Sequence, residues 1–109
     1  MKIRNIIIII LCFLMTSCMA KIKGLESESK AKNYMDRAAS FESTEAYHQA
    51  AQEYVTVAEH YPSTSYHKRA VWKAALLNMH PANPKINYAA ALNWLQVYLK
   101  LPLSNAEKE

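Results

Sequence analysis

Hydrophobic residues recur with the three- and four-residue spacing of helices over most of the chain, and no stretch alternates apolar and polar residues over the length of a strand. From position 29 onward the sequence contains no glycine and much alanine, a composition that favours helices. Pro62 and Pro102 are placed to end helices, and Pro84 is placed to begin one. These features predict an all-α fold of four antiparallel helices, paired as two helical hairpins, over 29–41, 45–60, 66–79 and 84–100.

Short polar residues stand before three of these helices and are candidate N-caps. Ser43 or Thr44 is placed to cap the second helix, a residue of the segment 63–65 the third, and Asn83 the fourth. We therefore expect these side chains to accept hydrogen bonds from the first backbone N–H groups of the helix that follows.

The N-terminal segment has a different pattern. Lys2 and Arg4 precede an unbroken apolar run over 6–15, and the small residues Thr16 and Ser17 then lead to Cys18. The run is far shorter than the ~20 residues of a membrane-spanning helix, and its length suits the apolar core of a signal peptide. The arrangement resembles the signal peptide and lipobox of bacterial lipoproteins, with one departure: Met15 stands where family members usually carry leucine.

The resemblance implies that Cys18 becomes the first residue of the mature protein and carries a covalent lipid, with palmitate among the acyl groups. Because Met19 is not the aspartate that retains such proteins at the inner membrane, it further implies the periplasmic side of the outer membrane. The predicted organisation is a signal peptide over 1–17, the lipidated cysteine and a flexible tether over 18–28, and a helical domain over 29–109.

Charge and cysteine content narrow the function classes. The formal net charge is +4, but Lys2 and Arg4 leave with the signal peptide, so the remaining excess is small and does not favour a nucleic-acid partner. Cys12 also leaves with the signal, and Cys18 is expected to be acylated. We therefore expect no disulfide, and stability has to come from helix packing.

The second and fourth predicted helices share a repeated pattern of a small, an aromatic and an apolar residue followed by proline. Four pairs of residues coincide at an offset of forty: Ala50 with Ala90, Tyr54 with Trp94, Val57 with Val97, and Pro62 with Pro102. This pattern resembles the second helix of a tetratricopeptide repeat, and Tyr34, Ala38 and Phe41 agree with the first helix, whereas Arg37 is a departure. The resemblance implies two repeat-like hairpins and a protein-binding role; the alternative is a generic four-helix bundle.

No residue pattern indicates catalysis. Gly24 is the single glycine, so no phosphate-binding loop is present, and the four histidines lack metal-ligand spacing. His60 and His80 are explained by favourable interactions at helix C-termini. We therefore expect no enzyme activity, no cofactor other than the lipid on Cys18, no metal and no small-molecule substrate.

Arg69 and Lys73 form one candidate binding site. They lie four residues apart, on one face of the third predicted helix. Repeat proteins that clamp C-terminal carboxylates place basic residues on comparable helices, so the resemblance implies a peptide-carboxylate site here. The alternative is an ordinary solvated face.

The fourth predicted helix offers a second candidate site. Its apolar arc spans about 240°, although one buried face needs little more than 100°. One part should pack on the other helices, and an additional apolar strip remains, formed by Tyr88, Leu92, Leu95 and Leu99. We expect this strip to bind a protein partner or a second copy of the chain, the alternative being that the first helix or the tether covers it.

Together these features predict a lipid-anchored protein of the cell envelope that scaffolds or modulates an assembly by binding another protein. Two alternatives remain at this point. The protein could be a peptide-carboxylate-binding accessory module of an envelope enzyme or sensor, or a purely structural lipoprotein.

Overall fold

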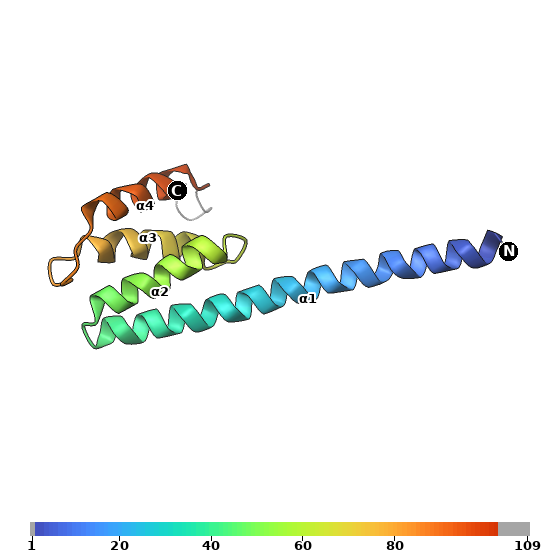
Figure 1. Cartoon of the computed structure of the whole chain (residues 1–109), viewed down its shortest axis with the longest axis horizontal. Coiled ribbons are helices and arrows are strands. Elements are labelled where there is room, and N and C mark those ends of the chain that lie inside the picture. The colour runs from blue at the N-terminus through green and yellow to red at the C-terminus, as the bar shows by residue number, and fades with distance from the viewer. Residues whose placement is uncertain (1, 103–109) are drawn as a thin grey trace, which may run out of the picture.

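The computed structural model describes residues 2–102, and its description of side chains leaves out residues 2, 4 and 10–23. It contains four helices, α1 (Lys2–Ser43), α2 (Tyr47–His60), α3 (His67–Asn78) and α4 (Tyr88–Lys100), and no strand within the described range. The predicted all-α class and the four helices are confirmed. Figure 1 shows that the chain reverses direction at each connection, so that successive helices run in opposite senses.

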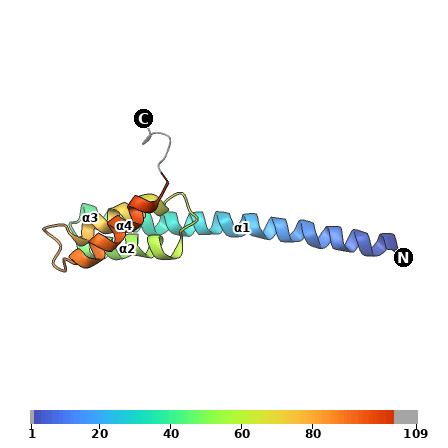
Figure 2. The ribbon, with the colours of Figure 1, turned by 90° about the horizontal axis from the view of Figure 1, so that it is seen from above.

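The helices are stacked in chain order, each packing mainly on its neighbours in the sequence. α1 and α4 are therefore the outer elements of the stack, and the view from above shows the four helices overlapping in one narrow block (Figure 2). The N-terminal half of α1 projects beyond this block, which gives the molecule its dimensions of 71 × 31 × 25 Å. None of the helices within residues 2–102 combines the length and the hydropathy that crossing a bilayer requires.

Alanine dominates the contacts between helices. Ala38, Ala50, Ala70 and Ala74 have no exposed surface, and small residues of this kind let two helix backbones approach closely. Larger side chains one turn away fill the space beside them, with Tyr54 as the largest of the buried core residues. The sequence therefore builds its core from closely spaced helices and a few large side chains.

α1 is much longer than the predicted first helix. The backbone of residues 19–26, expected to be a flexible tether, is helical. The physical reason is local: this stretch contains no proline, its one glycine is Gly24, and Glu26 forms an i,i+4 ion pair with Lys30 at 3.1 Å. Among the α1 side chains that the structure describes, Ala31 is the first buried one, so packing on the other helices begins close to position 29.

The predicted caps are a second correction. Ser43 and Thr44 bond backward, donating to the carbonyl oxygens of Ser40 (2.7 Å) and Phe41 (3.1 Å), so they end α1 rather than begin α2. In the segment 63–65, Thr64 donates to the Tyr61 carbonyl, and Ser65 donates from its N–H and hydroxyl to the Glu28 carboxylate on α1. Hydroxyl groups donate as readily as they accept, so their direction cannot be inferred from position alone.

The fourth helix begins later than predicted, because a different asparagine caps it. Asn87 Oδ1 accepts a hydrogen bond from the Ala90 N–H at 3.0 Å and is the N-cap of α4. Asn83 instead is 3% exposed and donates to the Leu77 carbonyl at the end of α3, while its oxygen accepts from the Lys85 N–H. Asn83 thus fixes the turn between α3 and α4.

Glu45, between α1 and α2, has a positive φ of 60°, and the N–H groups of Glu45 and Ala46 bond back to the carbonyls of Glu42 and Phe41. These two bonds form the Schellman pattern, in which glycine usually holds the left-handed position. Glu45→Gly is therefore expected to raise the free energy of unfolding by about 0.5–1 kcal/mol, because a side chain in this conformation is strained.

Urea denaturation followed by circular dichroism tests this prediction. Gln52→Gly, at an exposed position inside α2, is the matched control and is expected to lower the free energy of unfolding by roughly the same amount. A loss of stability in Glu45→Gly would contradict the assignment of strain to this turn.

Candidate functional site

α4 packs on the core with one side only. Ala91 is buried, and Trp94, Val97, Tyr98 and Leu101 are partly buried against the core cluster. Trp94 and Val97 of the repeated pattern thus pack inward as predicted, whereas the buried alanine is Ala91 and not Ala90, which is partly exposed. This packing leaves the opposite side of α4 facing solvent, since α4 is the last helix of the described stack.

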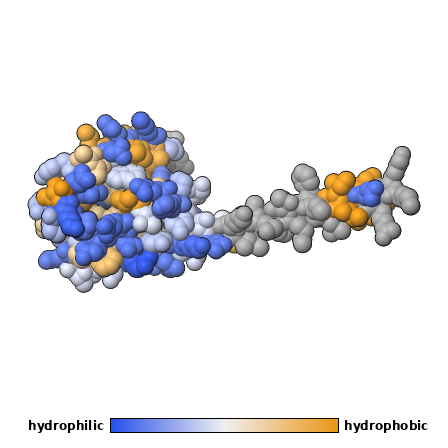
Figure 3. Space-filling model, in the orientation of Figure 1, coloured by the Kyte–Doolittle hydropathy of each residue, from blue (hydrophilic) through white to orange (hydrophobic). Residues whose placement is uncertain are grey.

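The apolar strip predicted on this helix is largely exposed. Tyr88 is 68% exposed, Leu92 58% and Leu99 79%, whereas Leu95 is partly buried. We call these four residues the α4 strip. Figure 3 shows hydrophobic surface among hydrophilic residues at the upper edge of the domain, where α4 lies. Within residues 2–102, α1 does not cover the α4 strip. The role of the α4 strip in binding stays a prediction.

The equivalent face of α2 is polar at three of its four positions. At the offset of forty residues, the α4 strip corresponds to His48, Gln52, Val55 and Glu59, of which Gln52 and Glu59 are exposed. The stacking of the helices therefore does not require apolar residues at these positions. Helix packing therefore does not explain the leucines of the α4 strip. A contiguous exposed apolar patch of this kind is usually a binding interface.

An aromatic pair adjoins the inward side of α4. Trp72 of α3 is 39% exposed, and its ring lies 5.0 Å from the ring of Tyr98. The Lys68 ammonium lies 5.6 Å from the centre of the same tyrosine ring. The sequence prediction missed this group, because the contact joins two helices; a signal was nevertheless present in Trp72, which is too large and apolar for an ordinary solvated position.

Of the two basic residues predicted to form a carboxylate site, Lys73 already pairs with a carboxylate of the domain. Lys73 is partly buried and forms an ion pair with Glu42 at 3.1 Å. The same carboxylate accepts a hydrogen bond of 2.7 Å from the Tyr54 hydroxyl. The pKa of Tyr54 is raised well above its ordinary value, mainly by burial and secondly by this hydrogen bond. The phenol therefore stays protonated and keeps donating.

Arg69 is exposed and lines a hollow of about 180 Å³ between α1 and α3. The hollow also holds the Asp36 side chain, which is unfavourable for a bound carboxylate. Lys73 is paired with Glu42 and Arg69 shares a hollow with Asp36, so a carboxylate of the domain already lies near each of the two cations.

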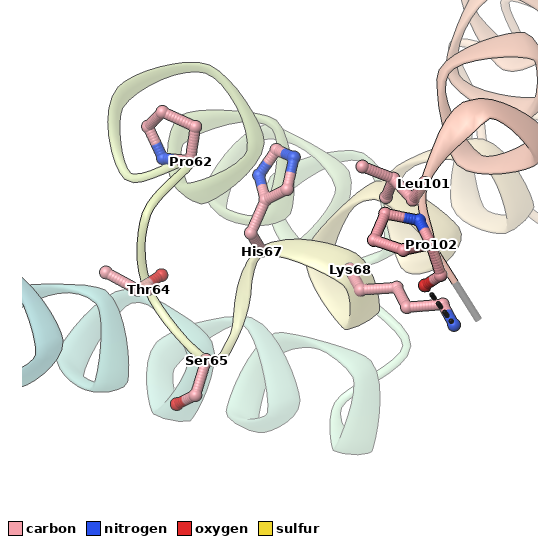
Figure 4. Close-up of a pocket in the computed structure, with 7 residues that line it drawn as sticks. All are labelled: Pro62, Thr64, Ser65, His67, Lys68, Leu101 and Pro102. Carbon is pink, nitrogen blue, oxygen red and sulfur yellow. Dashed lines mark hydrogen bonds between the residues drawn. The ribbon is translucent and has the colours of Figure 1, made fainter. Parts of the chain in front are cut away.

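A second hollow, of about 230 Å³, lies between the α2–α3 connection and the end of α4 (Figure 4). Its lining comes from the α2–α3 connection, the start of α3 and the two residues after α4: Pro62, Thr64, Ser65, His67, Lys68, Leu101 and Pro102. Lys68 Nζ donates to the Pro102 carbonyl at 3.4 Å, which ties α3 to the end of α4. The two residues of this contact both line the hollow.

His67 in this hollow predicts a pH dependence of stability. Its Nδ1 atom is buried without a hydrogen-bond partner among residues 2–102, and burial lowers the pKa of His67 below its ordinary value. The unfolded chain therefore takes up the proton at a higher pH than the folded chain does. The free energy of unfolding should be highest above the ordinary histidine pKa of ~6.5 and should fall as the pH drops below it.

Thermal unfolding at about pH 7.5 and about pH 5.5 tests this sign. His67→Gln is expected to lose less stability on acidification than the natural chain. His48→Gln on α2, outside the hollow, is the control and should retain the full loss. An identical loss in His67→Gln and in the natural chain would contradict the role of His67.

His80 contacts residues on both sides of it in the sequence. His80 accepts a hydrogen bond from the Ala82 N–H and stacks on Tyr47 with a ring separation of 4.1 Å, so it has a structural role at the end of α3. No group of three histidine, cysteine or acidic side chains is placed to hold a metal ion in the part of the chain that the structure describes. Comparison of the chain with protein-family models, curated proteins and solved structures finds no match.

Proposed function

We propose that this chain is a lipid-anchored, non-catalytic protein of the cell envelope that binds a protein partner through the α4 strip. The observation that carries this proposal is the exposure of Tyr88, Leu92 and Leu99 on a helix whose core face is already formed by other residues. The polar residues at the equivalent positions of α2 support it, because they indicate that packing alone does not select leucine there.

The proposed anchor is Cys18, whose side chain lies outside the described residues. Its support is the order of basic, apolar and small residues before it, together with the resemblance to the lipoprotein signal. Two or three acyl chains on this residue would hold the domain stably at a membrane, where a single chain gives marginal binding. We place the domain on the periplasmic side of an outer membrane.

The resemblance to tetratricopeptide repeats supports a binding role. Arg37, the departure from that pattern, lies over the Tyr34 ring at 4.6 Å and within 3.5 Å of Glu53 on α2. The Arg37 side chain therefore covers an aromatic ring and pairs with the neighbouring helix. Its long apolar stem can take the place of the apolar residue that the repeat pattern usually has there.

The carboxylate-binding alternative is the weaker candidate. It requires Arg69 and Lys73 to face one ligand, whereas Lys73 is paired with Glu42 and Arg69 lies beside Asp36. The alternative of a purely structural lipoprotein requires no partner at the α4 strip.

Chemical crosslinking in intact cells, followed by mass spectrometry, tests the proposal. The natural chain should form a specific adduct that the double variant Leu92→Gln/Leu99→Gln loses while keeping its helix content and melting temperature. Leu25→Gln, which removes an exposed leucine from α1, is the matched control and should keep the adduct. If the natural chain is monomeric and the folded double variant keeps every adduct, the α4 strip is not the binding surface.

A further inference from the structure

Charge is divided unequally between the two halves of the helical stack. Residues 24–59, which form the second half of α1 and nearly all of α2, contain seven acidic and three basic side chains. Residues 60–102, which include α3 and α4, contain no acidic residue and five basic ones, namely Lys68, Arg69, Lys73, Lys85 and Lys100. The helices that carry the exposed apolar surface are therefore cationic.

Three of these cations lie around α4. Lys85 stands shortly before the helix and Lys100 is its last residue, and both are exposed. Lys68 lies over the Tyr98 ring on the side of α4 that faces α3. A binding partner that covers α4 thus meets the positive charges of Lys85 and Lys100, one near each end of the helix.

The shape of the strip favours a helix as the partner. Its residues are spaced by four, three and four positions, and on a helical wheel they occupy an arc of only about 60°. A narrow seam with this alternation is typical of one helix packing against another. Amphipathic helices that lie on lipid present a broader apolar face, so the strip matches a partner helix better than a bilayer surface.

A second copy of the chain is a poor electrostatic match. Pairing two α4 helices would bring the lysines of one copy near those of the other, without a carboxylate from either segment 60–102. The face of α2 equivalent to the strip is polar, with Gln52 and Glu59 exposed, and offers no matching apolar seam. A partner that carries both an apolar seam and negative charge matches the α4 strip and the lysines around it.

We infer that the α4 strip binds an amphipathic helix of a partner protein, with apolar residues at the same three- and four-residue spacing and Asp or Glu on both sides of that seam. This inference rests on the proposed function and specifies the chemistry of the partner. The leucines exclude water from the centre of the contact, and Lys85 and Lys100 select the charge of the helix and its alignment.

Two synthetic helical peptides of about 20 residues test this inference. Both carry leucine at the seam positions, with glutamate on each side in one peptide and lysine in the other. The full-length chain, held in nanodiscs of neutral phosphatidylcholine, is titrated with each fluorescent peptide, and empty nanodiscs give the background. The glutamate peptide is expected to bind on the order of tenfold more tightly than the lysine peptide, with a preference that shrinks as salt is added.

Paired variants separate the two parts of the contact. Leu92→Gln/Leu99→Gln should weaken both peptides by about tenfold or more, and Lys85→Glu/Lys100→Glu should reverse the preference between them. Leu25→Gln and Lys32→Glu make the same chemical changes at exposed α1 positions and should leave both affinities unchanged.

Several results overturn the inference: no binding of the glutamate peptide, equal binding of the two peptides, or affinities that the Leu92→Gln/Leu99→Gln change does not alter. Binding of the chain to vesicles with about 30% phosphatidylglycerol that depends on Leu99, with no binding of the glutamate peptide, would assign the strip to lipid. A dimer in light scattering that Leu92→Gln dissociates would assign it to a second copy. A cellular adduct that depends on the strip, without glutamate-peptide binding, would retain the proposed function and reject only this partner chemistry.

Discussion

Tyr54→Ala is expected to lower the free energy of unfolding by about 3–5 kcal/mol, the largest effect of any single truncation of the core. Tyr54 is 2% exposed and lies on α2, which packs against both α1 and α3. Its removal opens a cavity between three helices and also deprives the Glu42 carboxylate of a hydrogen bond of 2.7 Å. In a domain whose whole stability is on the order of 5–15 kcal/mol, this change approaches complete unfolding.

The equivalent change in the second half of the chain should have a much smaller effect. Trp94 occupies the position of Tyr54 forty residues later, but it is only partly buried, because α4 packs chiefly on α3. Trp94→Ala is therefore expected to remove about 1–2 kcal/mol, although it deletes the larger side chain. Urea unfolding of both variants in mild detergent measures the difference, and equal losses would contradict the one-sided packing of α4.

The second large effect concerns Cys18. At ~0.8 kcal/mol per buried methylene, two or three acyl chains give an anchor far stronger than any single protein contact. We expect Cys18→Ser to abolish the labelling of the chain by radioactive palmitate and to remove the corresponding increase in mass. Cys12→Ser, six residues earlier in the proposed signal peptide, is the matched control and should be labelled like the natural chain.

The palmitate labelling also tests whether Cys18 is the lipid anchor. A Cys18→Ser chain that still takes up palmitate would reject the lipobox assignment, and so would a natural chain that is never labelled. Labelling that depends on Cys12 instead would move the proposed anchor into the apolar run.

The features that the sequence predicted well depend on helical periodicity. The inward residues of α4, including Trp94 and Val97, follow from spacing alone, and so does the exposed position of Leu99. These inferences succeed because a helix three turns long has one fixed relation between residue number and direction. Burial of one face then determines which residues remain outside.

The features that the sequence did not predict depend on contacts between distant residues. Lys73 is engaged by Glu42, thirty-one positions earlier in the chain, and sequence spacing did not indicate this pairing. Asn83, the predicted cap of the fourth helix, instead donates to the Leu77 carbonyl, and Asn87 caps α4 in its place. Local propensity supplied no information about either contact, because both depend on how the helices meet.

The central claim is that the outward face of α4, and not the equivalent face of α2, contacts a partner. Its most direct test is site-specific photo-crosslinking in intact cells, with the photoreactive residue at position 92 in one variant and at position 52 in the other. Both positions are exposed and lie at the same place in the repeated pattern. The account predicts a discrete protein adduct from position 92 and none from position 52; no adduct from position 92, or the same adduct from both positions, would contradict it.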